Sequence, residues 1–198
     1  MKHETDSGSE FISPTHLRYV LRYVNAAQIL KSIKPSRVLD AACGTGYGSN
    51  VLGSTLDGVS VIGVDSNEEA LAYATQNYTA RNVNFFNRDI LGKISDLGMF
   101  DAIISIETIE HFSRPNIDRY LECLTSQLIS GGVFIISTPF CEESGPSPIT
   151  LQHLYEFELT ELTKTLQVHG LSVLNLSLDW KPGPAGRLGY AMVTCKRA

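Results

Sequence analysis

Short apolar runs alternate with amphipathic segments along most of the chain. Apolar runs of about four to eight residues are typical of buried strands, whereas apolar positions that recur every three or four residues are typical of helices. The runs expected to form strands are 37–41, 59–64, 83–86, 100–106, 133–137, 171–178 and 190–196. Helical segments are expected between them. Such alternation predicts an α/β, Rossmann-like doubly wound sheet that is mostly parallel and covered by helices on both faces.

Two of the helices have recognisable starts. Segment 14–33 carries an apolar stripe, with Ser13 as the candidate N-cap and Pro14 at the first helical position. A second helix is expected to start at Ser66, because Glu69 follows three residues later and completes a capping box.

The pattern changes near the end of the chain. Segments 171–178 and 190–196 are both strand-like and are separated by the Pro- and Gly-rich segment 179–189. The two strands are therefore expected to pair antiparallel as a hairpin. Segments 139–152 and 179–189 both follow strands and are longer than simple connectors, so they are expected to be loops that shape a substrate pocket.

Composition and charge narrow the function classes. The chain has 198 residues, is 43% hydrophobic and carries a formal net charge of −5. One soluble domain is expected over 14–198, after a flexible segment at 1–13. The acidic balance disfavours an extended nucleic-acid groove, because phosphate binding uses clustered Lys and Arg. Without a bilayer-length apolar run or a secretion signal, no membrane partner and a cytoplasmic location are expected.

The cysteines do not encode a metal knuckle or a disulfide framework. They are scattered and form no C-x-x-C pair, so we expect reduced thiols. They are Cys43, Cys123, Cys141 and Cys195.

Segment 38–49 is the most informative part of the sequence for function. It runs from a buried-type strand through a glycine turn into a helix, which is where ligands of open α/β sheets bind. Gly44 and Gly46 let backbone N–H groups approach a ligand, and Asp40 adds a carboxylate beneath the turn. A dinucleotide loop would need a third glycine where Ser49 stands, and an acid before the turn repels a pyrophosphate. A nicotinamide-dependent oxidoreductase is therefore disfavoured.

Further carboxylates follow the next two expected strands. Asp65 comes after strand 59–64, where its two oxygens can accept both hydroxyls of a ribose. Asp89 follows strand 83–86 and can accept a hydrogen bond from an adenine amino group. Any one strand-terminal Asp is usually a turn residue. Asp40, Asp65 and Asp89 at three successive strand ends together predict a nucleoside site.

From about Pro14 onward, the sequence resembles the class I S-adenosylmethionine-dependent methyltransferases. Segment 40–46 is similar to the first motif of that family, and segment 100–112 is similar to its fourth-strand motif. The resemblance implies a seven-stranded sheet with an antiparallel last strand, S-adenosylmethionine as cofactor and methyl transfer as the activity. Arg22 lies in an arginine–tyrosine element similar to one that reaches the cofactor carboxylate in some members. The cofactor contacts implied in this way are Arg22, Asp40, Ala41, Gly44, Gly46, Asp65, Ser66, Asp89, Ile90 and Ile106.

A cluster of carboxylates and imidazoles follows the fourth expected strand, where the cofactor methyl group should point. At helical spacing, Glu107, Glu110 and His111 are expected on one face, and His153 is a further donor after the long loop. Carboxylate and imidazole ligands together suit Mg, Mn, Fe or Zn. If no metal binds, His111 and His153 are the candidate general bases, because a neutral imidazole can take a proton near pH 7.

The cluster resembles two metal-using branches of the family. These are the ubiquinone-biosynthesis O-methyltransferases and the small-RNA methyltransferases that modify a 3′-terminal ribose. The second branch also has a later His before an acidic and aromatic stretch similar to 153–157. We expect neither a separate RNA-binding domain nor a basic patch here, so the main hypothesis is O-methylation of a small molecule or sugar hydroxyl. A terminal-ribose RNA methyltransferase and a noncatalytic cofactor- or protein-binding module are the alternatives.

Overall fold

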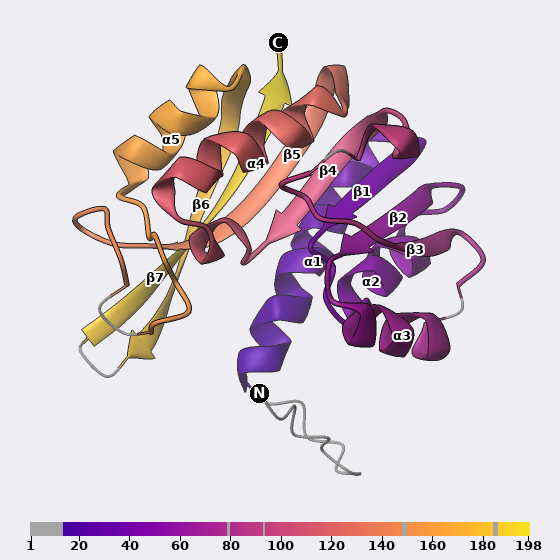
Figure 1. Cartoon of the computed structure of the whole chain (residues 1–198), viewed down its shortest axis with the longest axis horizontal. Coiled ribbons are helices and arrows are strands. Elements are labelled where there is room, and N and C mark those ends of the chain that lie inside the picture. Colours follow the sequence, from indigo (N-terminus) through magenta and orange to yellow (C-terminus); the bar gives the residue numbers. More distant parts are fainter. Residues whose placement is uncertain (1–13, 79, 93, 148–149, 184–185) are drawn as a thin grey trace.

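A seven-stranded sheet forms the centre of the computed structural model, which describes residues 14–78, 80–92, 94–147, 150–183 and 186–198 (Figure 1). The strand order is β3-β2-β1-β4-β5-β7-β6. The strands are β1 (Arg37–Ala41), β2 (Ser60–Asp65), β3 (Val83–Asn87), β4 (Phe100–Ile106), β5 (Leu128–Phe140), β6 (Leu171–Gly183) and β7 (Gly186–Arg197). The first five strands are parallel, and β7 is antiparallel to both β5 and β6. The predicted Rossmann-like sheet with an antiparallel last strand is confirmed.

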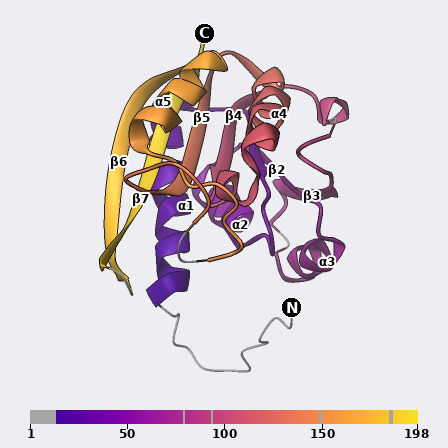
Figure 2. The ribbon, with the colours of Figure 1, turned by 60° about the vertical axis from the view of Figure 1, so that its left-hand side comes forward.

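Helices cover both faces of this sheet. They are α1 (Pro14–Ile33), α2 (Tyr47–Thr55), α3 (Glu68–Asn77), α4 (Arg114–Ser126) and α5 (Leu159–Val168), with short 3₁₀ turns η1 (Ser95–Leu97) and η2 (Ile109–His111). Helices α4 and α5 lie on one face, and α1 and α2 lie on the other (Figures 1 and 2). Segment 1–13, including the expected cap Ser13, lies outside the described residues. Within the described ranges, no helix has the length and apolar character that a bilayer crossing requires.

The continuous apolar runs in the central strands follow from these two helical layers. Alternate residues of a strand point to opposite faces. In β4, Ile103 joins the core beneath α4 and α5, whereas its neighbour Ile104 joins the core beneath α1 and α2. Because both faces are buried, the strand is apolar at nearly every position. Its carboxyl end leads directly into the predicted cluster that begins at Glu107.

Two local predictions were wrong. Segment 179–189 is not a long loop, because β6 and β7 stay paired from Trp180 opposite Gly189 out to Gly183 opposite Gly186. Its prolines suggested a loop, but an edge strand such as β6 tolerates a residue without an N–H donor. Helix α3 is also not capped by Ser66. Asn67 caps it, and its side-chain oxygen accepts from Glu69 N and Ala70 N at 3.0 and 3.1 Å.

Candidate active site

The turn after β1 uses its three glycines in different ways. A Cβ added to Gly44, which has a φ of +55°, would meet no atom within 4 Å, so this glycine borders open space. A Cβ on Gly46 would lie 2.6 Å from Ala74, and one on Gly48 would lie 2.1 Å from the Tyr23 ring. Gly44 is therefore the position where a ligand can approach the backbone, while Gly46 and Gly48 allow close packing within the protein.

Asp40 is an internal anchor beneath that turn. Its side chain is fully buried and accepts hydrogen bonds from Tyr23 Oη at 2.9 Å and Ser49 Oγ at 2.6 Å. Burial raises the pKa of Asp40 to about 6, although both hydroxyls act in the opposite direction. These contacts tie α1 and α2 to β1. Ser49, which takes the place of a third glycine, therefore has a structural task of its own.

The other two strand-end acids also hold backbone groups. Asp65 accepts from Gly44 N at 2.8 Å through Oδ2 and from Asn67 N at 2.9 Å through Oδ1, which fixes the glycine turn to the end of β2. Asp89 is exposed and accepts from Leu91 N at 2.9 Å. Because β1, β2 and β3 are parallel and adjacent, their carboxyl ends meet at one edge, as the sequence predicted.

The other residues predicted to contact the cofactor lie around these acids. Ala41 is the buried last residue of β1, and Ser66 is exposed just after β2. Ile90 and Ile106 are both 6% exposed, next to Asp89 and at the end of β4 respectively. They line the same edge of the sheet as the acids.

Glu107 is separated from the other members of its motif by the backbone. It follows β4 with a left-handed φ of 52°, and the 3₁₀ turn at 109–111 comes next. The expectation that Glu107, Glu110 and His111 share one helical face is therefore wrong. Glu107 Oε1 instead accepts from Ser137 Oγ at 2.5 Å and lies 3.7 Å from Arg22 Nε. Such strained non-glycine conformations concentrate at functional sites.

Glu110, His111 and His153 do converge. One potential ligand atom from each residue lies within 4.8 Å of the others. The chain returns here because Leu154 N and Tyr155 N donate to Glu110 O at 2.7 and 3.2 Å. The long loop after β5 therefore delivers His153 to the turn that follows β4.

One carboxylate oxygen of Glu110 is buried without a hydrogen-bond partner among the described residues. Its side chain is fully buried, and Oε2 accepts from Thr138 Oγ1 at 3.1 Å. Oε1 has no hydrogen-bond partner among the described residues. Burial, together with the Glu107 carboxylate, holds the pKa of Glu110 well above its ordinary range. An unpaired buried carboxylate oxygen is costly, and a bound cation would satisfy it.

The two imidazoles are held in a fixed orientation. His111 Nδ1 lies 2.9 Å from the Gln152 carbonyl oxygen, and His153 Nδ1 lies 2.7 Å from Glu156 Oε1. Carbonyl and ionised carboxylate oxygens only accept, so each Nδ1 donates, and in a neutral imidazole Nε2 is then the nitrogen that carries the lone pair. One carboxylate and two imidazoles with such supporting acceptors fit a divalent transition-metal cation.

The sequence interpretation assigned no role to several of these supporting residues. Hydrogen bonds link Asp40 to Tyr23, Glu110 to Thr138 and His153 to Glu156. Only Glu156 leaves a sequence signal, because an acid three residues after His153 can reach its imidazole. The contact of Tyr23 with Asp40 depends on how α1 packs on β1. The contact of Thr138 with Glu110 depends on the pairing of β4 with β5.

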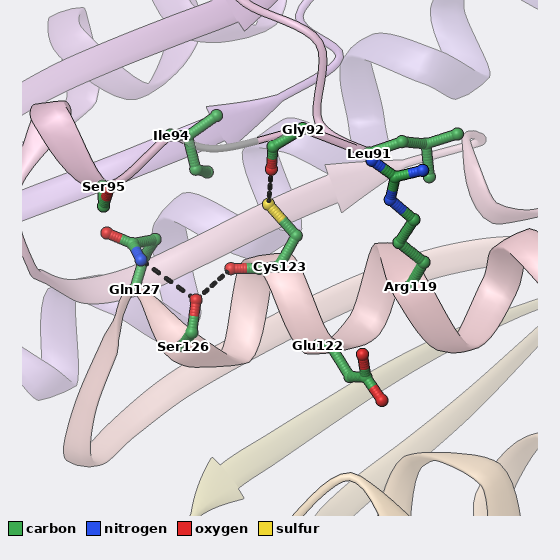
Figure 3. Close-up of a pocket in the computed structure, with 9 residues that line it drawn as sticks. All are labelled: Leu91, Gly92, Ile94, Ser95, Arg119, Glu122, Cys123, Ser126 and Gln127. Atoms are coloured by element: carbon green, nitrogen blue, oxygen red, sulfur yellow. Dashed lines mark hydrogen bonds between the residues drawn. The ribbon is translucent and has the colours of Figure 1, made fainter.

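A separate hollow of about 470 Å³ flanks the connection from β3 to β4 (Figure 3). Among the described residues of this connection, η1 is the one helical turn, and α4 lines the hollow through residues such as Arg119 and Cys123. Cys123 Sγ donates to the Gly92 carbonyl oxygen at 2.9 Å (Figure 3). The hollow touches the loop that carries Asp89 and Ile90 but contains neither residue.

Comparisons with known proteins agree with this architecture. Residues 38–132 match the sequence model of a family described as a methyltransferase domain. A probable S-adenosylmethionine-dependent methyltransferase of Mycolicibacterium smegmatis is 29% identical over 143 residues, which cover 69% of this chain and 52% of that protein. The chain thus spans about half the length of this curated relative.

Solved structures share the fold at low identity. Magnesium protoporphyrin IX methyltransferase from Synechocystis PCC 6803 with bound S-adenosylhomocysteine has a TM-score of 0.75 at 18% identity, over 96% of this chain and 90% of that one. The O-methyltransferase of a trans-AT PKS multienzyme of Brevibacillus brevis, in complex with S-adenosylhomocysteine, has a TM-score of 0.73 at 18% identity, over 91% and 72%. Over residues 38–132 the chain is therefore similar to methyltransferase domains, and its sheet and helices have the Rossmann-like fold of S-adenosylmethionine-dependent methyltransferases.

Proposed function

We propose that this chain transfers a methyl group from S-adenosylmethionine to a hydroxyl oxygen of a small molecule or sugar, assisted by a divalent cation. Glu110, His111 and His153 would hold the cation. The observation that carries the proposal is the convergence of these three side chains just after β4, with an unpaired buried oxygen on Glu110. An amine or thiol acceptor would need less help with proton removal than a hydroxyl needs.

The cofactor would lie along the carboxyl ends of β1 to β4. Asp65 is proposed to bind the ribose hydroxyls, Asp89 the adenine amino group and the Gly44 turn the methionine part. The open space beside Gly44 supports this placement. The two structurally similar methyltransferases described above were solved with S-adenosylhomocysteine bound. Resemblance alone assigns Arg22 to the cofactor carboxylate.

In the proposed reaction, the acceptor oxygen attacks the methyl carbon while the bond from carbon to sulfur breaks, and S-adenosylhomocysteine leaves. The hydroxyl proton must depart as the new bond forms. A bound divalent cation lowers the pKa of a hydroxyl that it contacts. The protein aligns the two substrates, and such alignment can supply about 7 to 11 kcal/mol of the barrier.

The same geometry allows proton removal without a metal. Because each Nδ1 of His111 and His153 donates to a fixed acceptor, each Nε2 can receive a proton. In that version, His111→Ala or His153→Ala should lower turnover about 10²- to 10⁴-fold while cofactor affinity stays nearly unchanged. A chelator would then have no effect on turnover, which separates the two versions.

Cofactor choice can be tested first. Isothermal titration calorimetry should show one S-adenosylhomocysteine bound per chain and no binding of NAD. The acids and the short glycine turn suit a nucleoside with an amino-acid tail rather than a pyrophosphate. Binding of NAD without binding of S-adenosylhomocysteine would rule out the proposed function.

The cation site can be tested without knowing the acceptor. We expect Mn²⁺ to bind the wild-type protein in calorimetry and to bind Glu110→Gln at least about tenfold more weakly, because the variant loses the anionic ligand. Glu143→Gln removes an exposed acid and is the matched control. Equal Mn²⁺ affinity in all three proteins would show that Glu110 is not a ligand of the cation.

The alternatives are separated by substrate assays. Transfer of a labelled methyl group to the 3′ end of an RNA oligonucleotide would favour the terminal-ribose activity. Binding of S-adenosylhomocysteine with no transfer to RNA, sugars or hydroxylated small molecules would favour a noncatalytic module.

A further inference from the structure

Tyr190 of β7 faces helix α1, which runs beside the hairpin of β6 and β7 (Figure 2). It lies directly opposite Asp179 of β6, so both side chains point to the same side of the sheet. Asp179 Oδ2 lies 2.9 Å from Arg18 Nη1. The Arg22 guanidinium lies over the Tyr190 ring, 4.5 Å from its centroid. Because Arg18 and Arg22 are four residues apart, one cross-strand pair holds two successive turns of α1.

The guanidinium of Arg22 is held by one carboxylate and two aromatic rings. The Arg22 side chain is 10% exposed, and its Nε lies 3.7 Å from Glu107 Oε1, an ion pair longer than a hydrogen bond. Its Cζ lies 5.4 Å from the centroid of the Tyr19 ring. The Tyr190 centroid is nearer, at 4.5 Å, and a ring attracts a cation more strongly at the shorter distance.

The Tyr190 ring can hold this cation without occupying its donors. Burial, together with the Glu107 carboxylate, raises the pKa of Tyr190 to about 12, so the phenol is neutral near pH 7. The negative face of a neutral ring attracts a guanidinium but offers it no carboxylate or carbonyl oxygen. The N–H donors of Arg22 therefore stay available for a carboxylate, which they can bind in a bidentate manner.

We infer that Tyr190 is a positioning residue for the cofactor, because it holds the Arg22 guanidinium in the place where Arg22 binds the cofactor carboxylate. The inference rests on the proposed function, which assigns that carboxylate to Arg22. The longer ion pair with Glu107 restricts the direction of the guanidinium plane less than an adjacent ring does. The last strand of the sheet would thereby act on cofactor affinity through the first helix.

The test compares two ligands that differ in the amino-acid tail. Methylthioadenosine keeps the adenosine and the sulfur of S-adenosylhomocysteine but lacks the tail and its carboxylate. We expect calorimetry to show that Tyr190→Leu weakens S-adenosylhomocysteine binding about 3- to 30-fold, because a desolvated contact between cation and ring is lost. Methylthioadenosine affinity should change by less than about twofold, whereas a general loss of structure would weaken both ligands. Tyr190→Phe keeps the ring and should bind both ligands within about twofold of the wild type.

Two further comparisons connect the effect to Arg22. In an Arg22→Gln background, Tyr190→Leu should cause no further loss of S-adenosylhomocysteine affinity, because the ring then has no cation to hold. Tyr73→Leu removes an exposed ring from α3 and should bind both ligands like the wild type. If Tyr190→Leu fails to fold, replacing Tyr190 by pentafluorophenylalanine keeps the ring size but removes its negative face. That replacement should weaken S-adenosylhomocysteine and leave methylthioadenosine unchanged.

Four results would overturn the inference. They are wild-type S-adenosylhomocysteine affinity in Tyr190→Leu, an equal loss for both ligands, a loss in Tyr190→Phe as large as in Tyr190→Leu, and losses that add in the double variant. The double variant decides the matter if methylthioadenosine binds too weakly to measure. If the wild type binds no S-adenosylhomocysteine, the proposed function and the inference both fail. Binding of S-adenosylhomocysteine without any methyl transfer would contradict the proposed function alone.

Discussion

Asp40 is a fully buried carboxylate whose ionisation opposes folding. Its pKa of about 6 lies above its ordinary value of 3.8, mainly because burial disfavours the charged form. Between these two pH values the folded protein binds more protons than the unfolded chain, so the free energy of unfolding should fall as pH rises from about 4 to 6. The difference corresponds to about 3 kcal/mol at most. This loss of stability with rising pH should be absent in Asp40→Asn, whose amide can still form hydrogen bonds with the hydroxyls of Tyr23 and Ser49.

Urea unfolding of both proteins between pH 4 and pH 7 measures this effect as the difference between their pH profiles. The control is Asp57→Asn, which removes an exposed acid and should keep the wild-type profile. Parallel profiles for the wild type and Asp40→Asn would contradict the predicted role of Asp40.

Asp65 carries the ribose assignment. Replacing Asp65 by Ala should weaken S-adenosylhomocysteine binding at least tenfold in calorimetry, because each hydrogen bond to a charged group contributes about 1.5 to 3 kcal/mol. The variant also frees Gly44 N and Asn67 N, which loosens the glycine turn. Asp57→Ala should leave the affinity unchanged. Wild-type affinity in Asp65→Ala would mean that the ribose lies elsewhere.

Single residues were predictable from the sequence where strand order alone fixes their place. Asp40, Asp65 and Asp89 each follow a strand of one parallel sheet, so their proximity needed no knowledge of packing. The hydrogen bonds that Tyr23 and Ser49 donate to Asp40 could not be predicted from strand order. They depend on the angle at which α1 and α2 lie against β1.

The contact between α1 and α2 depends on Gly48. A Cβ at Gly48 would come within 2.1 to 2.4 Å of the Tyr23 ring, which is itself buried and bonded to Asp40. Gly48→Ala should therefore destabilise the protein by about 1 to 3 kcal/mol in urea unfolding, as overpacked cores do. It should also weaken cofactor binding, because Tyr23 must move away from Asp40.

Gly145→Ala is the matched control, because a Cβ there meets no atom within 4 Å. Its stability and cofactor affinity should remain close to those of the wild type. If Gly48→Ala is as stable as this control, α1 and α2 can move apart without a loss of unfolding free energy. The close contact at Gly48 would then not be needed for stability.

At the level of elements, periodicity predicted the buried strands well and the turns poorly. Strand β4 was expected and found at Phe100–Ile106, because residues buried on both faces leave an unbroken apolar run. The next residues were expected to be helical, but Glu107 breaks the spacing with a left-handed φ, and only η2 follows. A single backbone angle of this kind leaves no mark in a hydrophobic pattern.

At the level of the whole molecule, the candidate site is assembled from distant parts of the chain. The strand-end acids come from β1 to β3, whereas Glu110 and His111 follow β4 and His153 arrives after the loop beyond β5. An unfolded chain holds none of this geometry. Ligands of the site should therefore bind only the folded protein and stabilise it through mass action.

S-adenosylhomocysteine at 100 times its dissociation constant should add about 2.7 kcal/mol of stability, which raises Tm by about 5 to 11 °C for a chain of this size. At one fixed concentration, Mn²⁺ should raise Tm further in the wild type and in Glu143→Gln, and by less in Glu110→Gln, which is expected to bind the ion more weakly. Without metal, Glu110→Gln should melt at or above the wild-type temperature, because it replaces a buried carboxylate that has an unpaired oxygen. Differential scanning calorimetry of the three proteins distinguishes these outcomes. A Glu110→Gln variant that melts lower without metal and gains as much stability from Mn²⁺ as the wild type would show that Glu110 serves the fold rather than a cation.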